Sequence, residues 1–571
     1  MIQSGNRRSL GRAAFLPVLL LVAGCQVATG VAPSGTSPAI TSADTRSRIS
    51  IVADDSMQGR RAGAIGNHTM TSYLEREVAR LGLEPAGENG TFFQVVPMVT
   101  RSVDSARTSM AVGGRTRRLF ADFAPLRPNM TERYGASLAP GVYETVYGGR
   151  AGDTTVVIPA SAVAGKIVVL DPPVDSTGRQ TGAWGTPGAL SVNRFPTAAG
   201  IAIVALDLVT PASAAGLRGT STAISERPGA EQRPMAFLIT AAVAGEILRG
   251  SPSLRPGAAG APISAGAGFV DRPVQSPARN VIAVLRGSDP QMQDEYVLIG
   301  AHSDHVGISA TPVDHDSLRS YNRVMRPEGA QRRGVQPTTP TPAQWSRIRA
   351  SLDSLRQLRP PRPDSINNGA DDDGSGSVAL LEIAESLAGG RPPGRSIIFI
   401  WHTAEENGLL GSAYFTAFPT IRRESIVAAL NMDMVGRGSA QDIPGGGPRY
   451  LQVIGSRRLA STLGNVLDSV NSVRRESFDI DYSWDAPGHP MSRYCRSDHY
   501  MYARRGIPIA YFSRGYHPDY HLVTDEPQYI NYEGLARVAR FVRDVAVALA
   551  DRNDRPAVDN PVPNPLLPCR Q

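Results

Sequence analysis

The sequence predicts an α/β fold, with a mixed and largely parallel sheet flanked by helices, into which a β-rich region is inserted. From Asn280 onward, short apolar runs typical of strands alternate with helical patterns, which favours a parallel sheet. Residues 131–272 instead alternate short β runs with loops rich in Gly, Pro and Ala. The 571 residues are too many for one hydrophobic core, so several domains are expected.

The composition and the charge narrow the class of protein. A hydrophobic content of 41% and a charged content of 19% are typical of a soluble globular chain. The formal net charge of +7 would suit a nucleic-acid partner. Because the basic residues are scattered and form no stripe, we expect no nucleic-acid partner.

The first 24 residues have the pattern of an export signal. Three arginines precede an apolar run at 13–23, which is too short to span a bilayer. The run ends in Val-Ala-Gly-Cys, which resembles a bacterial lipobox, so Cys25 is predicted to be lipidated; the alternative is an ordinary signal peptide with an incidental cysteine. Residues 25–45 then form a flexible tether. We therefore expect an exported lipoprotein of the cell envelope, anchored to a membrane surface and facing the periplasm or in the outer membrane.

The next two regions are expected to be structural. Residues 46–130 are assigned to the N-terminal part of the main domain, with a helix between Asn67 and Gly82. Within residues 131–272, the segments GKIVVLD and AAGIAIVALD resemble the protease-associated domain, a non-catalytic β-rich module inserted into several peptidase families. We find no cluster of metal-ligand residues and no nucleophile–base pair in that region.

The main domain continues over residues 273–553 and is followed by a loose, Pro-rich tail at 554–571. Its expected strands and helices are 281–285, 296–300, 376–387, 396–401, 426–430, 507–512 and a last amphipathic helix that begins near 535. A stretch at 308–366, rich in Arg, Pro, Ser and Gln, interrupts this pattern. A stretch of this length is either functional or disordered, so a lid at the rim of the site and a disordered loop are both open.

Polar residues capable of binding metal follow the predicted strands. They are His302, Asp304, Asp371, Glu405, Glu406, Asp433 and His521. Each alone has an ordinary structural explanation, such as a turn, a helix cap or a solvated surface. Because ligands bind beyond the carboxyl ends of parallel strands, residues that are far apart in the sequence are expected to converge at one edge. The joint pattern therefore predicts a metal site.

The residue types suit a hydrolytic zinc centre. Zinc binds imidazole nitrogen and carboxylate oxygen and keeps a position for water. Two metal ions about 3.5–4 Å apart need a shared carboxylate, and they lower the pKa of bound water towards about 7. A carboxylate that is not a ligand can then accept the proton of the water, which gives adjacent Glu405 and Glu406 different roles. Asp304 lies two residues after His302 and is expected to hold the far nitrogen of that ring.

These motifs resemble the M28 family of zinc peptidases. The resemblance is carried by AHSDH, GADDDGSG, TAEENGLLGS, NMDMVG and RGYHPDYHLVTD, and it extends over about residues 46–552. It implies the zinc aminopeptidase fold, two zinc ions per chain and peptide substrates. The ligand set is complete, which argues against a catalytically inactive relative.

The resemblance also implies individual roles. Asp371 becomes the shared carboxylate, with a cis peptide bond to the following aspartate. Glu406 and His521 complete one zinc site, and His302 and Asp433 complete the other.

Three further assignments follow from the same resemblance. Glu405 becomes the general base, Asp304 supports His302, and the hydroxyl of Tyr520 stabilises the oxyanion. His517 is a rival for His521, which we prefer because Tyr520, His521 and Asp525 match the family's YHxxxD context. His305 and His499 are expected to be structural or to lie behind the ligands.

The expected activity is that of a two-zinc exopeptidase, an aminopeptidase that removes N-terminal residues from peptides at the cell envelope. Three alternatives stay open: a carboxypeptidase or dipeptidase of the same family, a cyclotransferase like glutaminyl cyclase, and a non-catalytic binding protein that uses the protease-associated module. Cys495 and Cys569 form either a disulfide or two free thiols.

Overall fold

The computed structural model describes residues 35–128, 135, 137–153, 155–174, 178–180, 194–225, 233–248, 254–326, 339–564, 569 and 571. The predicted export signal and Cys25 lie outside the described residues. The chain divides into two units, Met1–Gly35 and Thr36–Gln571, and the fold below is that of the second. Among the described residues, none of the helices combines the length and the apolar character needed to cross a membrane.

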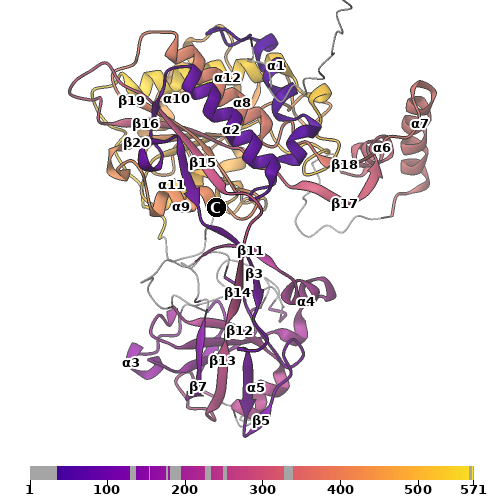
Figure 1. Ribbon diagram of the computed structural model, residues 1–571, viewed down its shortest axis with the longest axis vertical. Helices are drawn as coiled ribbons and strands as arrows, with labels where there is room; N and C mark the ends of the chain where they lie inside the picture. Colours follow the sequence, from indigo (N-terminus) through magenta and orange to yellow (C-terminus); the bar gives the residue numbers. More distant parts are fainter. Residues whose placement is uncertain are drawn as a thin grey trace, which may run out of the picture. The chain divides into compact units, whose positions relative to one another are not determined.

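A mixed sheet of nine strands organises the larger part of this unit (Figure 1). Its central strands β19 (Ser396–His402), β16 (Tyr296–His302), β20 (Ile426–Met432) and β23 (Ile509–Ser513) are parallel. Antiparallel β15 (Ala278–Leu285) and β21 (Tyr450–Ile454) flank them. The remaining strands are β1 (Glu84–Pro85), β2 (Phe93–Val96) and β22 (Asp479–Asp481). The predicted α/β class is confirmed.

Helices cover both faces of this sheet because successive strand residues point to opposite sides. In β19, Ile397, Phe399 and Trp401 pack into one core, and Ile398 and Ile400 pack into another. The first core contains α1 (Ser42–Val52), α2 (Ile65–Arg80), α8 (Gly374–Ala388), α10 (Ser461–Val473) and α12 (Tyr532–Ala550). The second contains α9 (Leu410–Ala417) and α11 (His499–Ala503). The site described below is therefore built on a sheet that is buried on both faces.

The β-rich region contains three smaller sheets. One has the order β6 (Phe123–Pro125), β12 (Met235–Ile239), β10 (Gly200–Val204), β9 (Ile167–Asp171) and β8 (Thr145–Arg150). The others are β11 (Ser221–Ile224), β3 (Met98–Val103) and β14 (Phe269–Pro273), and β5 (Arg115–Thr116), β4 (Ser109–Val112), β13 (Ile263–Ala267) and β7 (Leu138–Tyr143). Short helices α3 (Ala160–Val163), α4 (Pro211–Arg218) and α5 (Ala241–Ile247) connect the strands.

The strand pairing extends this region further towards the N-terminus than the sequence suggested. Residues 98–125 fall within the range 46–130, which the sequence assigns to the N-terminal part of the main domain. In the structure β3 pairs with β11 and β14, β4 pairs with β13, and β6 pairs with β12. These partner strands lie within residues 221–273. The sheet that a short strand joins depends on its neighbours across the strands, and the sequence of the strand alone does not identify those neighbours.

The stretch at 308–366 forms a helical hairpin on a two-stranded ribbon. Strands β17 (Gly307–Asp314) and β18 (Pro363–Asn367) pair antiparallel, and between them lie α6 (His315–Met325) and α7 (Pro342–Leu358) (Figure 1). A capping box formed by Thr341 and Gln344 begins α7. The described residues of this stretch, which we call the insertion, are therefore ordered into regular elements.

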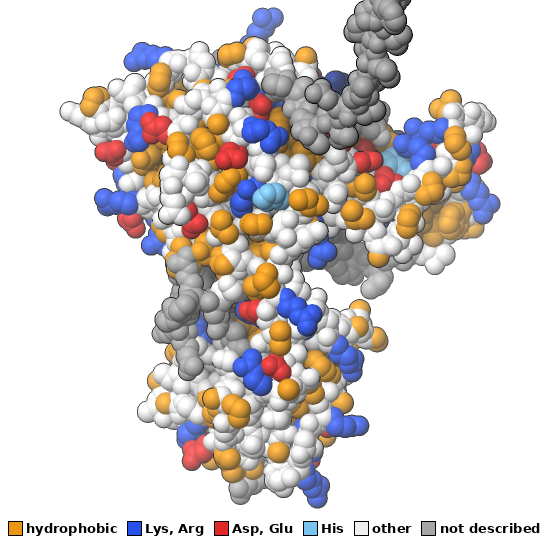
Figure 2. All heavy atoms as spheres, in the orientation of Figure 1, with side chains coloured by type: hydrophobic (Ala, Val, Ile, Leu, Met, Phe, Trp, Pro, Cys, Tyr) orange, Lys and Arg blue, Asp and Glu red, His pale blue; other side chains and the backbone are white. Residues whose placement is uncertain are grey.

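Ion pairs stabilise the insertion, and a disulfide attaches the C-terminal tail. Asp316 at the start of α6 receives ion pairs from Arg356, Arg359 and Arg362. In Figure 2, Lys and Arg side chains gather on this part of the surface.

Cys495 and Cys569 form a disulfide with a Cα–Cα distance of 5.7 Å, which resolves the alternative left open by the sequence.

Candidate metal centre

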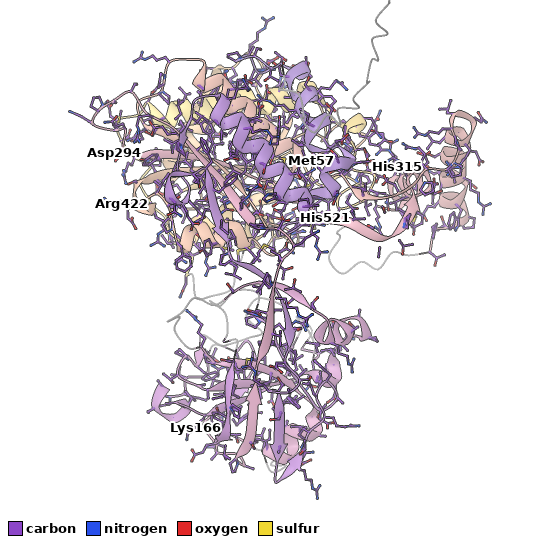
Figure 3. The ribbon with its side chains drawn as sticks, viewed as in Figure 1. Met57, Lys166, Asp294, His315, Arg422 and His521 are labelled. Atoms are coloured by element: carbon purple, nitrogen blue, oxygen red, sulfur yellow. A yellow bond between two sulfur atoms is a disulfide. The ribbon has the colours of Figure 1, made fainter. Side chains whose placement is uncertain are left out.

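Adjacent parallel strands bring the candidate ligands to one edge of the central sheet. β16 ends at His302 and β19 ends at His402, and these two residues are partners in the ladder. Glu405 and Glu406 follow β19, and Asp433 follows β20 directly. The segment after β23 returns to this edge and contributes His521, which Figure 3 labels. The convergence expected from the strand pattern is present.

The side chains form two groups with metal-ligand spacing. His302, Glu405 and Asp433 form the first group, and His305, Asp372, Glu406 and His521 form the second. Within each group, one potential ligand atom per residue lies within 4.8 Å of the others. Most of these side chains are buried, so the carboxylates need cations close by to offset the loss of water.

Asp372 connects the two groups. Its Oδ1 lies 3.3 Å from Nε2 of His302, and its Oδ2 lies 3.0 Å from Nε2 of His521. In the second group, Oε2 of Glu406 lies 2.9 Å from Nε2 of His521. The two oxygens of one buried carboxylate therefore face two sets of ligands, as a carboxylate shared by two metal ions would.

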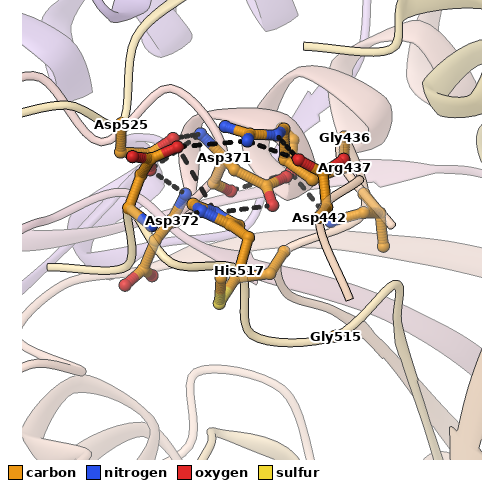
Figure 4. A network of polar contacts seen from close by, with 12 residues as sticks. Asp371, Asp372, Gly436, Arg437, Asp442, Gly515, His517 and Asp525 are labelled. Atoms are coloured by element: carbon orange, nitrogen blue, oxygen red, sulfur yellow. Dashed lines mark hydrogen bonds and ion pairs between the residues drawn. The ribbon is translucent and has the colours of Figure 1, made fainter. Parts of the chain in front are cut away.

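The sequence-based assignment of Asp371 as the shared carboxylate is not what the geometry shows. Oδ1 of Asp371 accepts a hydrogen bond from the amide of Gly436 at 2.6 Å, and Oδ2 lies 3.2 Å from Nε2 of His517 (Figure 4). The cis peptide bond follows Asp372, joining it to Asp373, whereas we expected it to follow Asp371. In a run of three aspartates nothing local marks which carboxylate points inward, so the assignment was displaced by one residue.

The third aspartate of the run, Asp373, is a scaffold. Its carboxylate accepts hydrogen bonds from the amides of His302 at 3.1 Å and Met434 at 3.2 Å. It also caps α8 by accepting from the amide of Gly376 at 2.9 Å. Asp373 thus ties the ends of β16 and β20 to the first turn of α8, which fixes the backbone on both sides of the first group.

Asp304 supports the site differently from the expectation. Nδ1 of His302 lies 3.0 Å from the backbone carbonyl of Asp304, whereas the carboxylate oxygen is 3.8 Å away. The carboxylate instead accepts from the amides of Glu405 at 3.0 Å and Glu406 at 3.3 Å. Burial raises the pKa of Asp304 to about 7. Asp304 therefore orients the two glutamates through its side chain and His302 through its main chain.

Glu405, which the sequence predicts to be the general base, is a member of the first group. Its Oε2 lies 4.0 Å from Nε2 of His302, and the side chain is 10% exposed. Burial raises the pKa of Glu405, and the negative charges of Glu406 and Asp433 act in the same direction, although His302 opposes them. A raised pKa makes the carboxylate a stronger base, which suits a group that accepts a proton from water.

The aromatic side chains beside the second group include the predicted Tyr520. Its ring stacks on His521 at 3.9 Å between centroids and on Tyr516 at 4.5 Å. Burial raises the pKa of Tyr520, so its hydroxyl stays protonated and can donate a hydrogen bond.

The three other histidines considered for the site have different surroundings. His517 contacts Asp371 and belongs to neither group, so the structure brings His521 to the ligands rather than its rival. His499 lies on α11, where burial lowers its pKa to about 3 and its ring packs against Tyr511. His305 was expected to be structural or to lie behind the ligands, yet it lies within the second group. Its place directly after Asp304 in AHSDH was the available indication.

The donor set fits zinc. Each group offers imidazole nitrogen and carboxylate oxygen, both of which bind zinc. Thiolate ligands are missing from both groups, and among the described residues the cysteines are joined in the disulfide. The residues that would hold one zinc are His302 and Asp433, those that would hold the other are Glu406 and His521, and Asp372 faces both.

A comparison with known families agrees with this geometry. Residues 280–546, which contain all the side chains of both groups, match the model of peptidase family M28. This part of the chain therefore resembles the peptidases of family M28.

The chain is also similar to individual proteins and solved structures. The chain is similar to leucine aminopeptidase 1 from Neurospora crassa, with 32% identity over 193 residues, covering 32% of this chain and 45% of that protein. Leucine aminopeptidase 1 from Aspergillus oryzae is 28% identical over 196 residues, covering 32% and 47%. The chain thus spans about half the length of these relatives. A zinc aminopeptidase from Bacillus subtilis is similar in structure, with 15% identity, coverage of 92% and 98%, and a TM-score of 0.42.

Proposed function

We propose that this protein is a two-zinc aminopeptidase that hydrolyses N-terminal residues from peptides. The observation that carries the proposal is Asp372, whose two carboxylate oxygens face one imidazole in each ligand group. In this proposal His302 and Asp433 hold one zinc, and Glu406 and His521 hold the other. The family match of residues 280–546 and the names of the sequence relatives support the hydrolase class and the aminopeptidase direction.

The chain's own residues carry the proton transfers. Zinc ions bound here would polarise the scissile carbonyl and lower the pKa of a nearby water. Glu405 takes the proton of that water as its oxygen bonds to the carbonyl carbon, and then delivers the proton to the leaving nitrogen as the C–N bond breaks. Asp304 keeps Glu405 in place through the amide hydrogen bond at 3.0 Å. The protonated hydroxyl of Tyr520 donates to the carbonyl oxygen as negative charge develops on it.

Two alternatives are less well supported by the site. A cyclotransferase that works with one zinc has no need for the complete first group of His302, Glu405 and Asp433. A binding protein whose metals only stabilise the fold has no use for a buried glutamate beside the ligands. A carboxypeptidase or dipeptidase would use the same groups, so substrate trimming has to distinguish it from an aminopeptidase.

We extend the proposal to location and to the β-rich region. Lipidation of Cys25 and export to the cell envelope rest on the leader sequence, and the disulfide between Cys495 and Cys569 suits an oxidising compartment. The β-rich region is proposed to be a protease-associated domain, supported by its sequence motifs and its sheet content.

The test is the digestion of a peptide mixture by the zinc-loaded chain without residues 1–34, followed by mass spectrometry. Truncation there keeps Thr36, whose hydroxyl donates to Glu385 at 2.7 Å. The same peptides with acetylated N-termini are the matched control. Stepwise loss of N-terminal residues from the free peptides alone is expected. Trimming of both sets from the C-terminus would replace the proposal with a carboxypeptidase, and no cleavage by a chain that holds two zinc ions would favour the binding protein.

A further inference from the structure

His305 lies among the proposed ligands, but its contacts differ from theirs. Its Nδ1 is 3.0 Å from Oε1 of Glu406 and 3.7 Å from Oδ2 of Asp372. Only the first distance allows a hydrogen bond. The other oxygen of Glu406, Oε2, lies 2.9 Å from Nε2 of His521. The two oxygens of Glu406 therefore have separate partners, with Oε2 turned towards the ligand set and Oε1 turned towards His305.

The hydrogen bonds of its ring nitrogens distinguish His305 from a histidine that binds metal directly. A histidine that binds metal almost always donates its other N–H to a carbonyl or carboxylate. His302 follows this rule, with Nδ1 placed 3.0 Å from the carbonyl of Asp304. Nε2 of His305 is buried and has no hydrogen-bond partner among the described residues. A proton on Nδ1, donated to Glu406, is the arrangement that leaves no buried N–H unpaired.

The surrounding backbone holds the His305 ring rigidly. The amide of His305 donates to the carbonyl of Arg60 at 3.2 Å. On the other side the ring packs against Gly369, where a Cβ atom would lie 2.5 Å from Cδ2 of the histidine. The guanidinium of Arg60 donates to the carbonyl of Gly369 at 2.8 Å, so the two segments that flank the ring are hydrogen-bonded to each other. A ring fixed in this way can impose an orientation on the carboxylate that it contacts.

We propose that His305 is a positioning residue for zinc: its Nδ1–H donates to Oε1 of Glu406 and so turns Oε2 towards the metal. This inference rests on the proposed zinc site but assigns a role that the expected ligand set leaves out. Partners of this kind change metal affinity by about 10- to 100-fold when they are removed. The effect is confined to the zinc held by Glu406 and His521, because the first group makes no use of His305.

The experiment compares zinc binding by His305→Ala and His305→Asn with that of the parent chain. The Asn side chain carries its amide nitrogen on Cγ, as His carries Nδ1, and can donate to Glu406 in the same place. Each zinc-loaded protein is titrated with a chelator, and bound zinc is measured by elemental analysis. We expect His305→Ala to lose about 10- to 100-fold in the affinity of one zinc and His305→Asn to recover most of that loss. His68→Ala, on the outer helix α2, is the control and should bind as the parent does.

Each other outcome has a defined meaning. Unchanged zinc affinity in His305→Ala would overturn the inference. An equal loss in both variants would also overturn it, because a donor that fails to rescue indicates direct ligation by the ring. If the parent chain binds no zinc, the proposed function fails and this inference fails with it, whereas a parent that binds two ions isolates the question of His305. Circular dichroism of the metal-free variants establishes that they are folded.

Discussion

The insertion is predicted to hold the segment that carries His521. Arg319 on α6 forms a buried ion pair with Asp519, two residues before His521. The guanidinium also lies 3.3 Å from the centroid of the Tyr529 ring. Although burial alone would raise it, the charges of Arg319 and Arg437 lower the pKa of Asp519, so this carboxylate is ionised. Replacing Arg319 by Met removes the charge and keeps a long apolar stem.

The contacts of Asp519 set limits on the free-energy cost of Arg319→Met. Removing one partner of a buried pair costs about 3–5 kcal/mol when the remaining charge is left alone. Asp519 keeps Arg437, whose Nη2 lies 3.1 Å away, so that limit is not reached. The loss of one hydrogen bond to a charged group is about 1.5–3 kcal/mol. A difference of about 1.4 kcal/mol changes an equilibrium constant tenfold. Residues 517–525 should therefore open ~10- to 150-fold more often in the variant.

Hydrogen exchange of the metal-free protein measures this opening directly. Peptides that cover 517–525 should exchange ~10- to 150-fold faster in Arg319→Met, and peptides of the central sheet should be unaffected. Arg323→Met is the matched control, because Arg323 is exposed on the same helix. If exchange accelerates in α6 but not in 517–525, then the insertion does not support the ligand segment and the reasoning is refuted.

Three further predictions concern single side chains. Glu405→Gln should lower kcat by about 10²- to 10⁴-fold and leave the zinc content unchanged, and a loss of metal in this variant would contradict its role as the base. Asp372→Asn should lose at least one zinc per chain in elemental analysis while Asp371→Asn keeps two, and the reverse result would restore the assignment made from sequence. Burial raises the pKa of Glu526 from an ordinary 4.5 to about 8, so its folded form binds the proton more tightly and this group destabilises the fold as the pH rises through that interval. Glu526→Gln should therefore match the parent below about pH 4.5 and be more stable by ~2–5 kcal/mol above pH 8, as measured by urea unfolding of the metal-free protein.

The central strands and the polar residues at their ends were predictable because a strand buried on both faces leaves an uninterrupted apolar run in the sequence. Apolar runs such as 396–401 and 426–430 are buried on both faces of the sheet, so their whole length is apolar and the first polar residues mark the edge. The position of Glu405, Glu406 and Asp433 follows from that pattern. The last helix was equally visible, since its apolar stripe becomes the buried side of α12.

What could not be predicted depends on backbone direction and on distant partners. In the GADDDG run, three identical side chains take three different roles according to local backbone geometry, and sequence does not encode which one faces the metals. Asp304 contacts His302 as predicted, but it does so through its backbone carbonyl. Its carboxylate instead accepts hydrogen bonds from the amides of Glu405 and Glu406. The contact between His305 and Glu406 could not be predicted, because Glu406 lies 101 residues further along the chain.

One segment after β23 determines the geometry of both ligand groups. Asp525 accepts from the amides of Asp371 at 3.1 Å and Asp372 at 3.0 Å, and so sets the direction of the shared carboxylate (Figure 4). Four residues earlier the same segment supplies His521 to the second group. Asp519 ties it to Arg319 of the insertion and to Arg437 after β20. A disturbance of this segment therefore reaches the carboxylate that faces both groups, and it should weaken both zinc sites together, whereas a change at His305 should weaken only one.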